Sequence, residues 1–264
     1  MASVVDDLAF LMSMNSPTNV HGLGSYMQTT GFTLPGFPCM GAWISYALGQ
    51  INQNLPEFIV MPDPKGLPYN NLGNFTSGFL PARHQGTVIN ASDSRPVRYL
   101  FPPAEARHIN AASEQASRDI LSALNENHAS RTPGGTRLED RIQSLEMAAR
   151  MQLSVPELFD MKGESQAVKS LYGMNEKNTE DFAKRCILGR RMLERGVRFV
   201  QIWSGAGGPS KNWDNHANIH TELPYMTRQV DKPIAGLIKD LSLIHISEPT
   251  RPLYISYAVF CLKK

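Results

Sequence analysis

The chain has no apolar run that approaches the roughly 20 residues needed to span a bilayer. It also has no basic segment followed by an apolar core near Met1, so no secretory signal is visible. The formal net charge is only +2 over 264 residues, which implies no strong electrostatic attraction to nucleic acid. Three scattered cysteines are too few for a disulfide framework or a thiolate zinc site. These absences predict a protein with no membrane span and no nucleic-acid partner.

The segments that are present predict an α/β fold. Short apolar runs at 9–14, 57–61 and 197–203 are typical of strands. Helical periodicity covers about 21–30, 40–50, 104–128, 136–153, 179–194 and 220–240. Strands that alternate with helices favour a mainly parallel sheet covered on both faces. Residues 62–103 hold no long periodic segment, and we expect an irregular surface insertion that is either a binding loop or a structural wrap.

The stretch after the best predicted strand carries side chains that suit a metal ion. Residues 197–203 lead into a Gly-rich connector, which is followed by Asp214, His216 and His220. Proteins of the α/β class place ligands in this way, in loops at the carboxyl end of a sheet. Carboxylate and imidazole groups bind Zn²⁺, Mn²⁺ and similar ions. The alternative interpretation is an exposed loop with solvated histidines.

Residues 241–264 resemble a translated DNA-sequencing adapter rather than natural protein. Residues 241–251 match one fixed block of a transposase adapter, residues 255–264 match its far end, and a variable index fits between them. The tail holds three basic residues and one acidic residue, so the rest of the chain has no formal net charge. We therefore expect the natural sequence to cover 1–240 and to continue past it. Such a fragment is expected to be inactive alone and to leave an apolar face uncovered.

Eight segments of residues 1–240 resemble the bacterial domain-of-unknown-function family numbered 1501, which is related to sulfatases and alkaline phosphatases. They are WISYALG at 43–49, NLPEFIV at 54–60, SGFLPA at 77–82, QGT at 85–87, MAARMQ at 147–152, LYG at 171–173, RGVRFVQ at 195–201 and the pair Trp213-Asp214. The resemblance implies that 1–240 is part of an alkaline-phosphatase-like, three-layer α/β/α sandwich with a mainly parallel sheet. It also implies export to the periplasm of a bacterium.

The resemblance further implies roles for individual residues. Asp214 and His216 match the family's Trp-Asp-x-His segment and are expected to bind a divalent metal ion such as Zn, Ca or Mg, with His220 in reserve. His21 lies near the position of the sulfatase nucleophile and is the expected catalytic residue. No Cys-x-Pro-x-Arg motif is present there, which argues against a formylglycine mechanism. Ser16 and Thr18 are reserve nucleophiles, although their hydroxyls equally suit turn chemistry.

Two functions follow from the resemblance. The first is a metal-dependent hydrolase of sulfate or phosphate esters, whose substrate is a small anionic ester or a sulfated glycan. Lys211 and Arg83 are basic residues that could meet such an ester, although single loop cations are usually only solvated. The second is a non-catalytic relative that keeps the fold and uses residues 62–103 to bind a glycan or a partner protein.

Overall fold

The computed structural model describes residues 1–93, 96, 97, 106, 109–131, 136–207, 212–216 and 218–247. The predicted tail therefore lies outside the described residues from position 248 onward. The α-helices are α1 (His21–Thr30), α2 (Met40–Leu48), α3 (Ala111–Arg131), α4 (Thr136–Phe159), α5 (Gln166–Tyr172), α6 (Glu180–Glu194) and α7 (Ile219–Ser247). The strands are β1 (Phe58–Met61), β2 (Thr87–Val88) and β3 (Phe199–Ile202). Short 3-10 helices are η1 (Ala2–Asp7), η2 (Asn71–Phe75), η3 (Ala82–His84) and η4 (Met161–Gly163).

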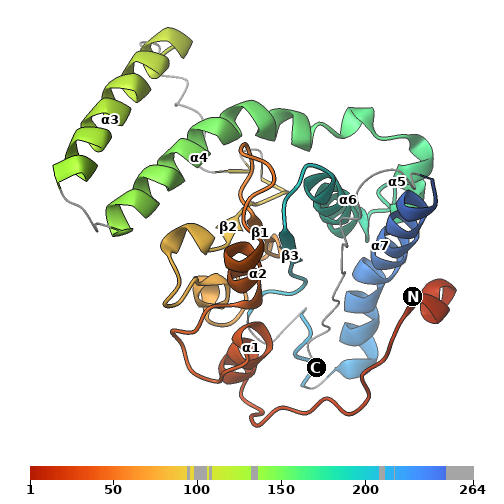
Figure 1. Ribbon diagram of the computed structural model, residues 1–264. Helices are drawn as coiled ribbons and strands as arrows, with labels where there is room; N and C mark the ends of the chain where they lie inside the picture. Colours follow the sequence, from red (N-terminus) through yellow and green to blue (C-terminus); the bar gives the residue numbers. More distant parts are fainter. Residues whose placement is uncertain are drawn as a thin grey trace.

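The three described strands form one parallel sheet near the middle of the molecule, in the order β2-β1-β3 (Figure 1). Ile59 of β1 lies opposite Thr87 on one side and opposite Val200 on the other. All four residues of β1 are buried, which is typical of a central parallel strand covered on both faces. The predicted α/β class with a parallel sheet is therefore confirmed, in the form of a small sheet among many helices.

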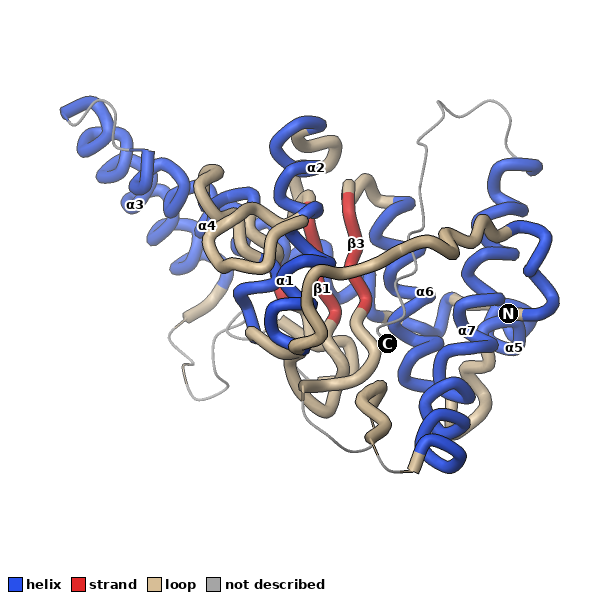
Figure 2. The backbone as a smooth tube through the Cα atoms, turned by 90° about the horizontal axis from the view of Figure 1, so that it is seen from below, coloured by secondary structure: helices blue, strands red, loops and turns tan. Residues whose placement is uncertain are grey.

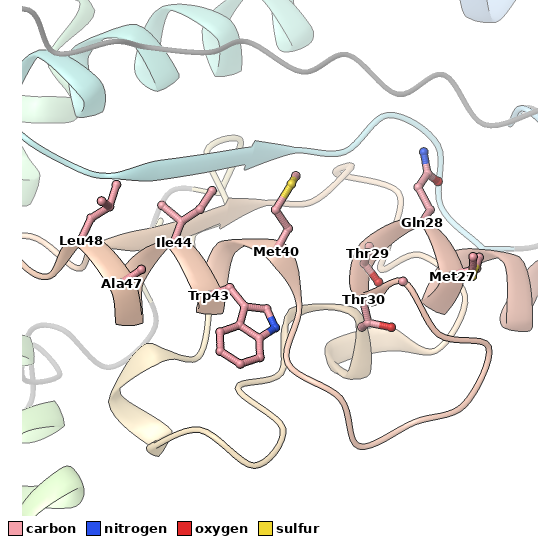
Figure 3. A pocket seen from close by; sticks show the side chains of 10 residues that line it. Met27, Gln28, Thr29, Thr30, Met40, Trp43, Ile44, Ala47 and Leu48 are labelled. Carbon is pink, nitrogen blue, oxygen red and sulfur yellow. The ribbon is translucent and has the colours of Figure 1, made fainter. Parts of the chain in front are cut away.

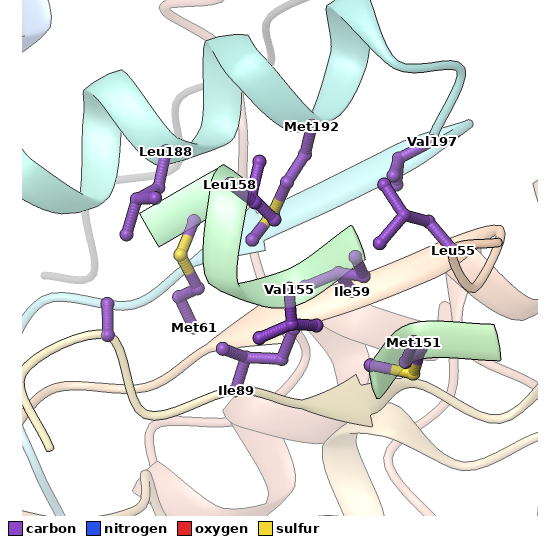
Figure 4. Close-up of a cluster of buried hydrophobic side chains, with 11 residues drawn as sticks. Leu55, Ile59, Met61, Ile89, Met151, Val155, Leu158, Leu188, Met192 and Val197 are labelled. Carbon is purple, nitrogen blue, oxygen red and sulfur yellow. The ribbon is translucent and has the colours of Figure 1, made fainter. Parts of the chain in front are cut away.

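The two faces of β1 enter different cores because successive side chains point to opposite sides of a strand. Ile59 and Met61 pack against α4 and α6 (Figure 4). The buried members of that cluster are Leu55, Ile59, Met61, Ile89, Ala91, Met151, Val155, Leu158, Leu188, Met192 and Val197. Phe58 and Val60 pack on the other side, against the residues around α2. The sheet is thus packed against helices on both faces.

Helices α5, α6 and α7 group together on one side of the sheet (Figure 2). The Tyr172 hydroxyl donates a hydrogen bond to Asp240 Oδ2 at 2.7 Å, and Arg190 lies 3.1 Å from the same carboxylate. The chain's amino group pairs with Asp231 of α7 at 2.8 Å, which places η1 beside that helix. None of the described helices is both long and apolar enough to cross a membrane.

Residues 9–14, predicted to form a buried strand, form no strand. The side chains of Phe10, Leu11, Met12 and Met14 are between 62% and 88% exposed. The prediction is wrong because an apolar run becomes a strand only beside another strand that satisfies its backbone groups. In the described residues the sheet consists of β2, β1 and β3 alone, and residues 9–14 pair with none of them.

The segment 62–103, predicted as an irregular surface insertion, reaches into the interior. Within its described residues it supplies β2 and buries Phe75, His84 and Ile89. Residues 94, 95 and 98–103 lie outside the described part of the chain. The lack of periodicity was a sound sign of irregular backbone, but it said nothing about burial.

Candidate metal centre

Three predicted site residues meet although they are far apart in the sequence. His21 opens α1, whereas Asp214 and His216 lie in the loop between β3 and α7. His21 Nε2 is 3.1 Å from Asp214 Oδ2, and His216 Nε2 is 2.6 Å from Asp214 Oδ1. One ligand atom from each residue lies within 4.8 Å of the other two. We call His21, Asp214 and His216 the donor cluster.

The loop that carries Asp214 is shaped by its own polar side chains. The Asn212 side chain accepts the Asp214 N–H at 2.7 Å and donates to the Ala206 carbonyl at 3.1 Å. Trp213 Nε1 donates to Ser204 Oγ at 3.2 Å, which ties the loop back to the end of β3. Gly205 has φ +85°, and a Cβ there would lie 2.9 Å from the Trp213 ring, so only glycine fits the turn.

The buried side chains of Asp63 and Arg185 form hydrogen bonds with backbone groups just after the carboxyl ends of β1 and β3. Asp63, two residues after β1, accepts the Gly205 N–H at 2.8 Å and the Lys65 N–H at 2.9 Å. Arg185 of α6 donates to the backbone carbonyls of Pro62 and Trp203 and pairs with Asp181 at 2.7 Å. These bonds satisfy carbonyls and charges that would be costly to bury alone. They also anchor Trp203 and Gly205, from which the loop that carries Asp214 begins.

Residues 67–70 join the two halves of the donor cluster. The Leu67 carbonyl accepts the Gly207 N–H at 2.9 Å, on the β3 side. Asn70 Nδ2 donates to the Gly22 carbonyl at 2.6 Å, in the first turn of α1. Between them, the Tyr69 ring stacks on the His21 ring, and the Tyr69 hydroxyl lies 3.4 Å from Asp214 Oδ2. We call Leu67, Tyr69 and Asn70 the bracket.

The cluster is sheltered at its centre and open at one side. The side chains of Asp214, His21 and His216 are 13%, 34% and 71% exposed, respectively. The largely buried Asp214 carboxylate lies between the two imidazoles, and each of its oxygens faces one ring. His216 forms the solvent side of the cluster.

The donor chemistry fits a transition-metal ion. Two imidazoles and one carboxylate are the protein ligands of several catalytic zinc sites, which keep a further position open. Ca²⁺ and Mg²⁺ prefer oxygen ligands, so among the expected ions Zn²⁺ suits this set best. The three ligand atoms lie within 4.8 Å of one another, so they are grouped closely enough to be candidates for binding one ion.

The reserve residues are not members of the donor cluster, which consists of His21, Asp214 and His216. His220 is exposed in the first turn of α7. Ser16 Oγ accepts the Thr18 N–H at 3.4 Å, and Thr18 Oγ1 accepts the Val20 N–H at 3.1 Å. Both hydroxyls therefore make the turn bonds that were the alternative to a nucleophilic role. Arg83 is exposed on η3, and Lys211 lies outside the described residues.

Sequence reasoning missed the residues that support the cluster. Asp63 had a usable signal, because a carboxylate directly after a buried strand lies at the ligand-binding edge of a parallel sheet. Tyr69 and Asn70 had none, since they belong to a segment without periodicity. Their role depends on contacts with residues 145 and 48 positions away, respectively.

A family model described as "Protein of unknown function (DUF1501)" matches residues 1–244. The match covers the donor cluster and the bracket, and it includes the first four residues of the segment 241–264 that resembles an adapter. No curated protein and no solved structure matches the chain.

Proposed function

The chain belongs to the DUF1501 family, and we propose that it is a divalent-metal-dependent hydrolase of phosphate or sulfate esters. The observation that carries the proposal is the convergence of His21, Asp214 and His216 to within 4.8 Å. They come from two segments separated by most of the chain. The family name assigns no activity, so the proposal rests on the site's chemistry and on the resemblance to sulfatases and alkaline phosphatases.

The residues of the site suit that chemistry. Asp214 is the central donor because both imidazoles already face its two oxygens. His21 is held by the Tyr69 ring and completes the set from α1. The open side at His216 leaves room for a water molecule or an ester oxygen. A divalent ion bound there would polarise the ester and lower the pKa of an attacking group.

The finer expectations from the resemblance are part of the same proposal. They are an alkaline-phosphatase-like sandwich in the complete protein, export from a bacterial cytoplasm, and a small anionic ester or a sulfated glycan as substrate. The nucleophile is unassigned, because Ser16 and Thr18 engage the backbone and no Cys-x-Pro-x-Arg motif precedes α1.

The test measures metal first and turnover second. The chain is loaded with Zn²⁺ or Mn²⁺, dialysed, and its metal content is determined by mass spectrometry. We expect one ion per chain, lost in Asp214→Asn and retained in Asp231→Asn, a control that removes an exposed carboxylate on α7. No bound metal, or equal retention in both variants, would overturn the proposal.

Turnover is then followed with p-nitrophenyl phosphate and p-nitrophenyl sulfate, on this chain and on a longer chain with the family's flanking segments. Hydrolysis of either ester that disappears in Asp214→Asn supports the enzyme. Stoichiometric metal without hydrolysis of either ester by the longer chain favours the second candidate. That candidate is a non-catalytic relative that binds a glycan or a partner protein, and the turn-bonded hydroxyls of Ser16 and Thr18 are the observation in its favour.

A further inference from the structure

Helix α1, which carries His21, buries hydroxyl groups rather than apolar side chains. A helix is usually held by an apolar stripe that faces the core, but the buried residues of α1 are Ser25 and Thr29. Thr29 Oγ1 donates to the Ser25 carbonyl at 2.9 Å, within the helix itself. The Ser25 hydroxyl instead reaches another element, because it donates to Asn74 Oδ1 of η2 at 2.7 Å. This buried bond is therefore a specific link between α1 and the rest of the fold.

Among the described elements, η2 is the main neighbour of α1. The two approach closely, because a Cβ at Gly73 of η2 would lie 2.5 Å from the Tyr26 hydroxyl. Towards α2, by contrast, the end of α1 borders an open groove of about 630 Å³, whose walls include Met27, Met40 and Ile44 (Figure 3). Close contact on one side and open space on another leave η2 to set the orientation of α1.

Asn74 is 0% exposed and uses both ends of its amide. Its oxygen accepts the Ser25 hydroxyl, while its Nδ2 donates to the Tyr69 carbonyl and, at 3.2 Å, to the Asn71 carbonyl. A side-chain amide offers an acceptor and two donors on one planar group. Aspartate would lose the donors and leucine would lose every bond, and each loss would leave buried polar groups unsatisfied.

The Nδ2 bonds of Asn74 close a turn whose backbone is costly. Asn70 and Asn71 have φ values of +66° and +49°, in the left-handed region that residues other than glycine seldom adopt. Such a conformation persists where the surrounding structure holds it, and Asn74 binds the carbonyls of Tyr69 and Asn71 on either side of Asn70. The ring of Tyr69 in turn stacks on His21. Asn74 thus fixes both the helix that carries His21 and the residue that stacks on it.

We propose that Asn74 is a positioning residue of the donor cluster, which acts through His21. Ser25 follows His21 by one helical turn and lies on the same face of α1. A rotation of α1 that breaks the bond between Ser25 and Asn74 would therefore also turn the His21 ring away from Tyr69 and Asp214. Buried groups that hold a ligand in place are what make a site precise.

The inference rests on the proposed metal site for its effect on Zn²⁺, but the position of His21 can be measured without metal. Asp214 does not share the dependence on Asn74, because its loop is held by the bonds of Asn212 and Trp213. Loss of the Asn74 amide should therefore displace one ligand of the cluster and leave the other segment in place.

The first test follows the ring protons of His21 by NMR in the metal-free full chain, with His21→Gln to assign them. The ring current of a stacked Tyr69 shifts these resonances upfield. Asn74→Leu keeps the number and branching of the side-chain atoms but forms none of the hydrogen bonds, so the resonances should move to the position of an exposed histidine. Ser25→Ala should move them part of the way. Tyr172→Phe is the matched control, because it also removes a buried hydroxyl that donates at 2.7 Å, within the α5–α7 cluster, and it should leave His21 unchanged.

The second test is a double-mutant cycle on Zn²⁺ affinity, measured by titration calorimetry. Asn74→Leu should raise the dissociation constant by about 10- to 100-fold in the parent chain and have no further effect in a His21→Ala background. A general loss of structure would instead weaken binding in both backgrounds, and that result would refute the positioning role.

His21 resonances that stay in place in Asn74→Leu and Ser25→Ala overturn the proposal, as do resonances that move equally in Tyr172→Phe. Ser25→Ala carries the test alone if Asn74→Leu does not fold. A parent chain that binds no Zn²⁺, but whose His21 resonances move in these variants and not in Tyr172→Phe, would sink the proposed hydrolase and support the positioning role of Asn74.

Discussion

The ring of Tyr69 lies parallel to the ring of His21, with centroids 4.9 Å apart and planes inclined by 9°. The hydroxyl of the same tyrosine is 3.4 Å from Asp214 Oδ2. One side chain therefore touches both halves of the donor cluster, α1 through its ring and the β3–α7 loop through its oxygen. Groups that orient metal ligands in this way commonly change metal affinity when they are altered.

Replacing Tyr69 should weaken metal binding in two separable steps. Tyr69→Phe removes the hydroxyl and keeps the stacked ring, whereas Tyr69→Leu removes both contacts. We expect the dissociation constant for Zn²⁺ to rise in that order, within the 10- to 100-fold range typical of residues that support metal ligands. Titration calorimetry measures it, and Tyr225→Phe on α7 is the control for loss of a hydroxyl outside the cluster. Equal affinity in all three variants would show that the stacking is incidental.

The two histidines that follow Asp214 should behave differently. His216 lies 2.6 Å from the carboxylate, whereas His220 is the second residue of α7 and is not a member of the donor cluster. We expect His216→Ala to reduce Zn²⁺ affinity by at least ~100-fold, since it removes one of the three proposed ligands, and His220→Ala to leave it unchanged. The visible absorption of bound Co²⁺ gives a second readout of ligand number. Loss of metal in both variants would mean that α7 unwinds to bring His220 into the site.

Local elements of the fold could be predicted from the sequence, and their assembly could not. The bounds of α1 agree with the expected 21–30, because Gly31 in the left-handed conformation ends the helix at a residue that is readable in the sequence. The apolar runs at 57–61 and 197–203 became β1 and β3. The run at 9–14 is equally apolar and stayed exposed, since strand formation depends on a neighbour elsewhere in the chain.

The candidate site was also predictable only in its local parts and not in its assembly. Asp214 and His216 could be selected because they follow a strand at the edge where parallel sheets bind ligands. His21 came from a family resemblance, and its proximity to Asp214 required the three-dimensional structure. The bracket was unpredictable because its contacts join an aperiodic loop to two distant segments. In α2, the apolar pattern predicted a helix correctly but did not say that Gly41, rather than Trp43, faces the sheet.

The buried thiol of Cys186 should make the protein less stable at high pH. Burial raises its pKa from 9.0 to about 12, and nearby Arg185 opposes the rise only in part. Between pH 9 and 12 the unfolded chain has released this proton while the folded chain still holds it. The free energy of unfolding should therefore fall with rising pH, by up to about 1.4 kcal/mol per pH unit from this group.

Urea unfolding at a series of pH values measures this slope, with Cys186→Ala for comparison. Tyr172 adds to the slope in both proteins, because burial and the hydrogen bond to Asp240 raise its pKa as well. The alanine variant should be less stable overall, owing to the cavity, but its stability should fall less steeply above pH 9. Parallel curves for the two proteins would contradict the assignment to Cys186.

Replacing either of two helical glycines by alanine should change the stability of the protein, in opposite directions at the two positions. Gly24 in α1 has nothing within 4 Å of an added Cβ. Gly24→Ala should therefore stabilise the protein by about 0.4–1 kcal/mol, because alanine lowers the conformational entropy of the unfolded chain. Gly41 in α2 has Phe58 at 2.6 Å and Phe199 at 2.7 Å from the same position. Gly41→Ala should push α2 off the sheet and cost about 1–3 kcal/mol. Chemical denaturation measures the change in the free energy of unfolding for each variant. A Gly41→Ala variant that is more stable than the parent would mean that α2 does not lie against β1 and β3 at this distance.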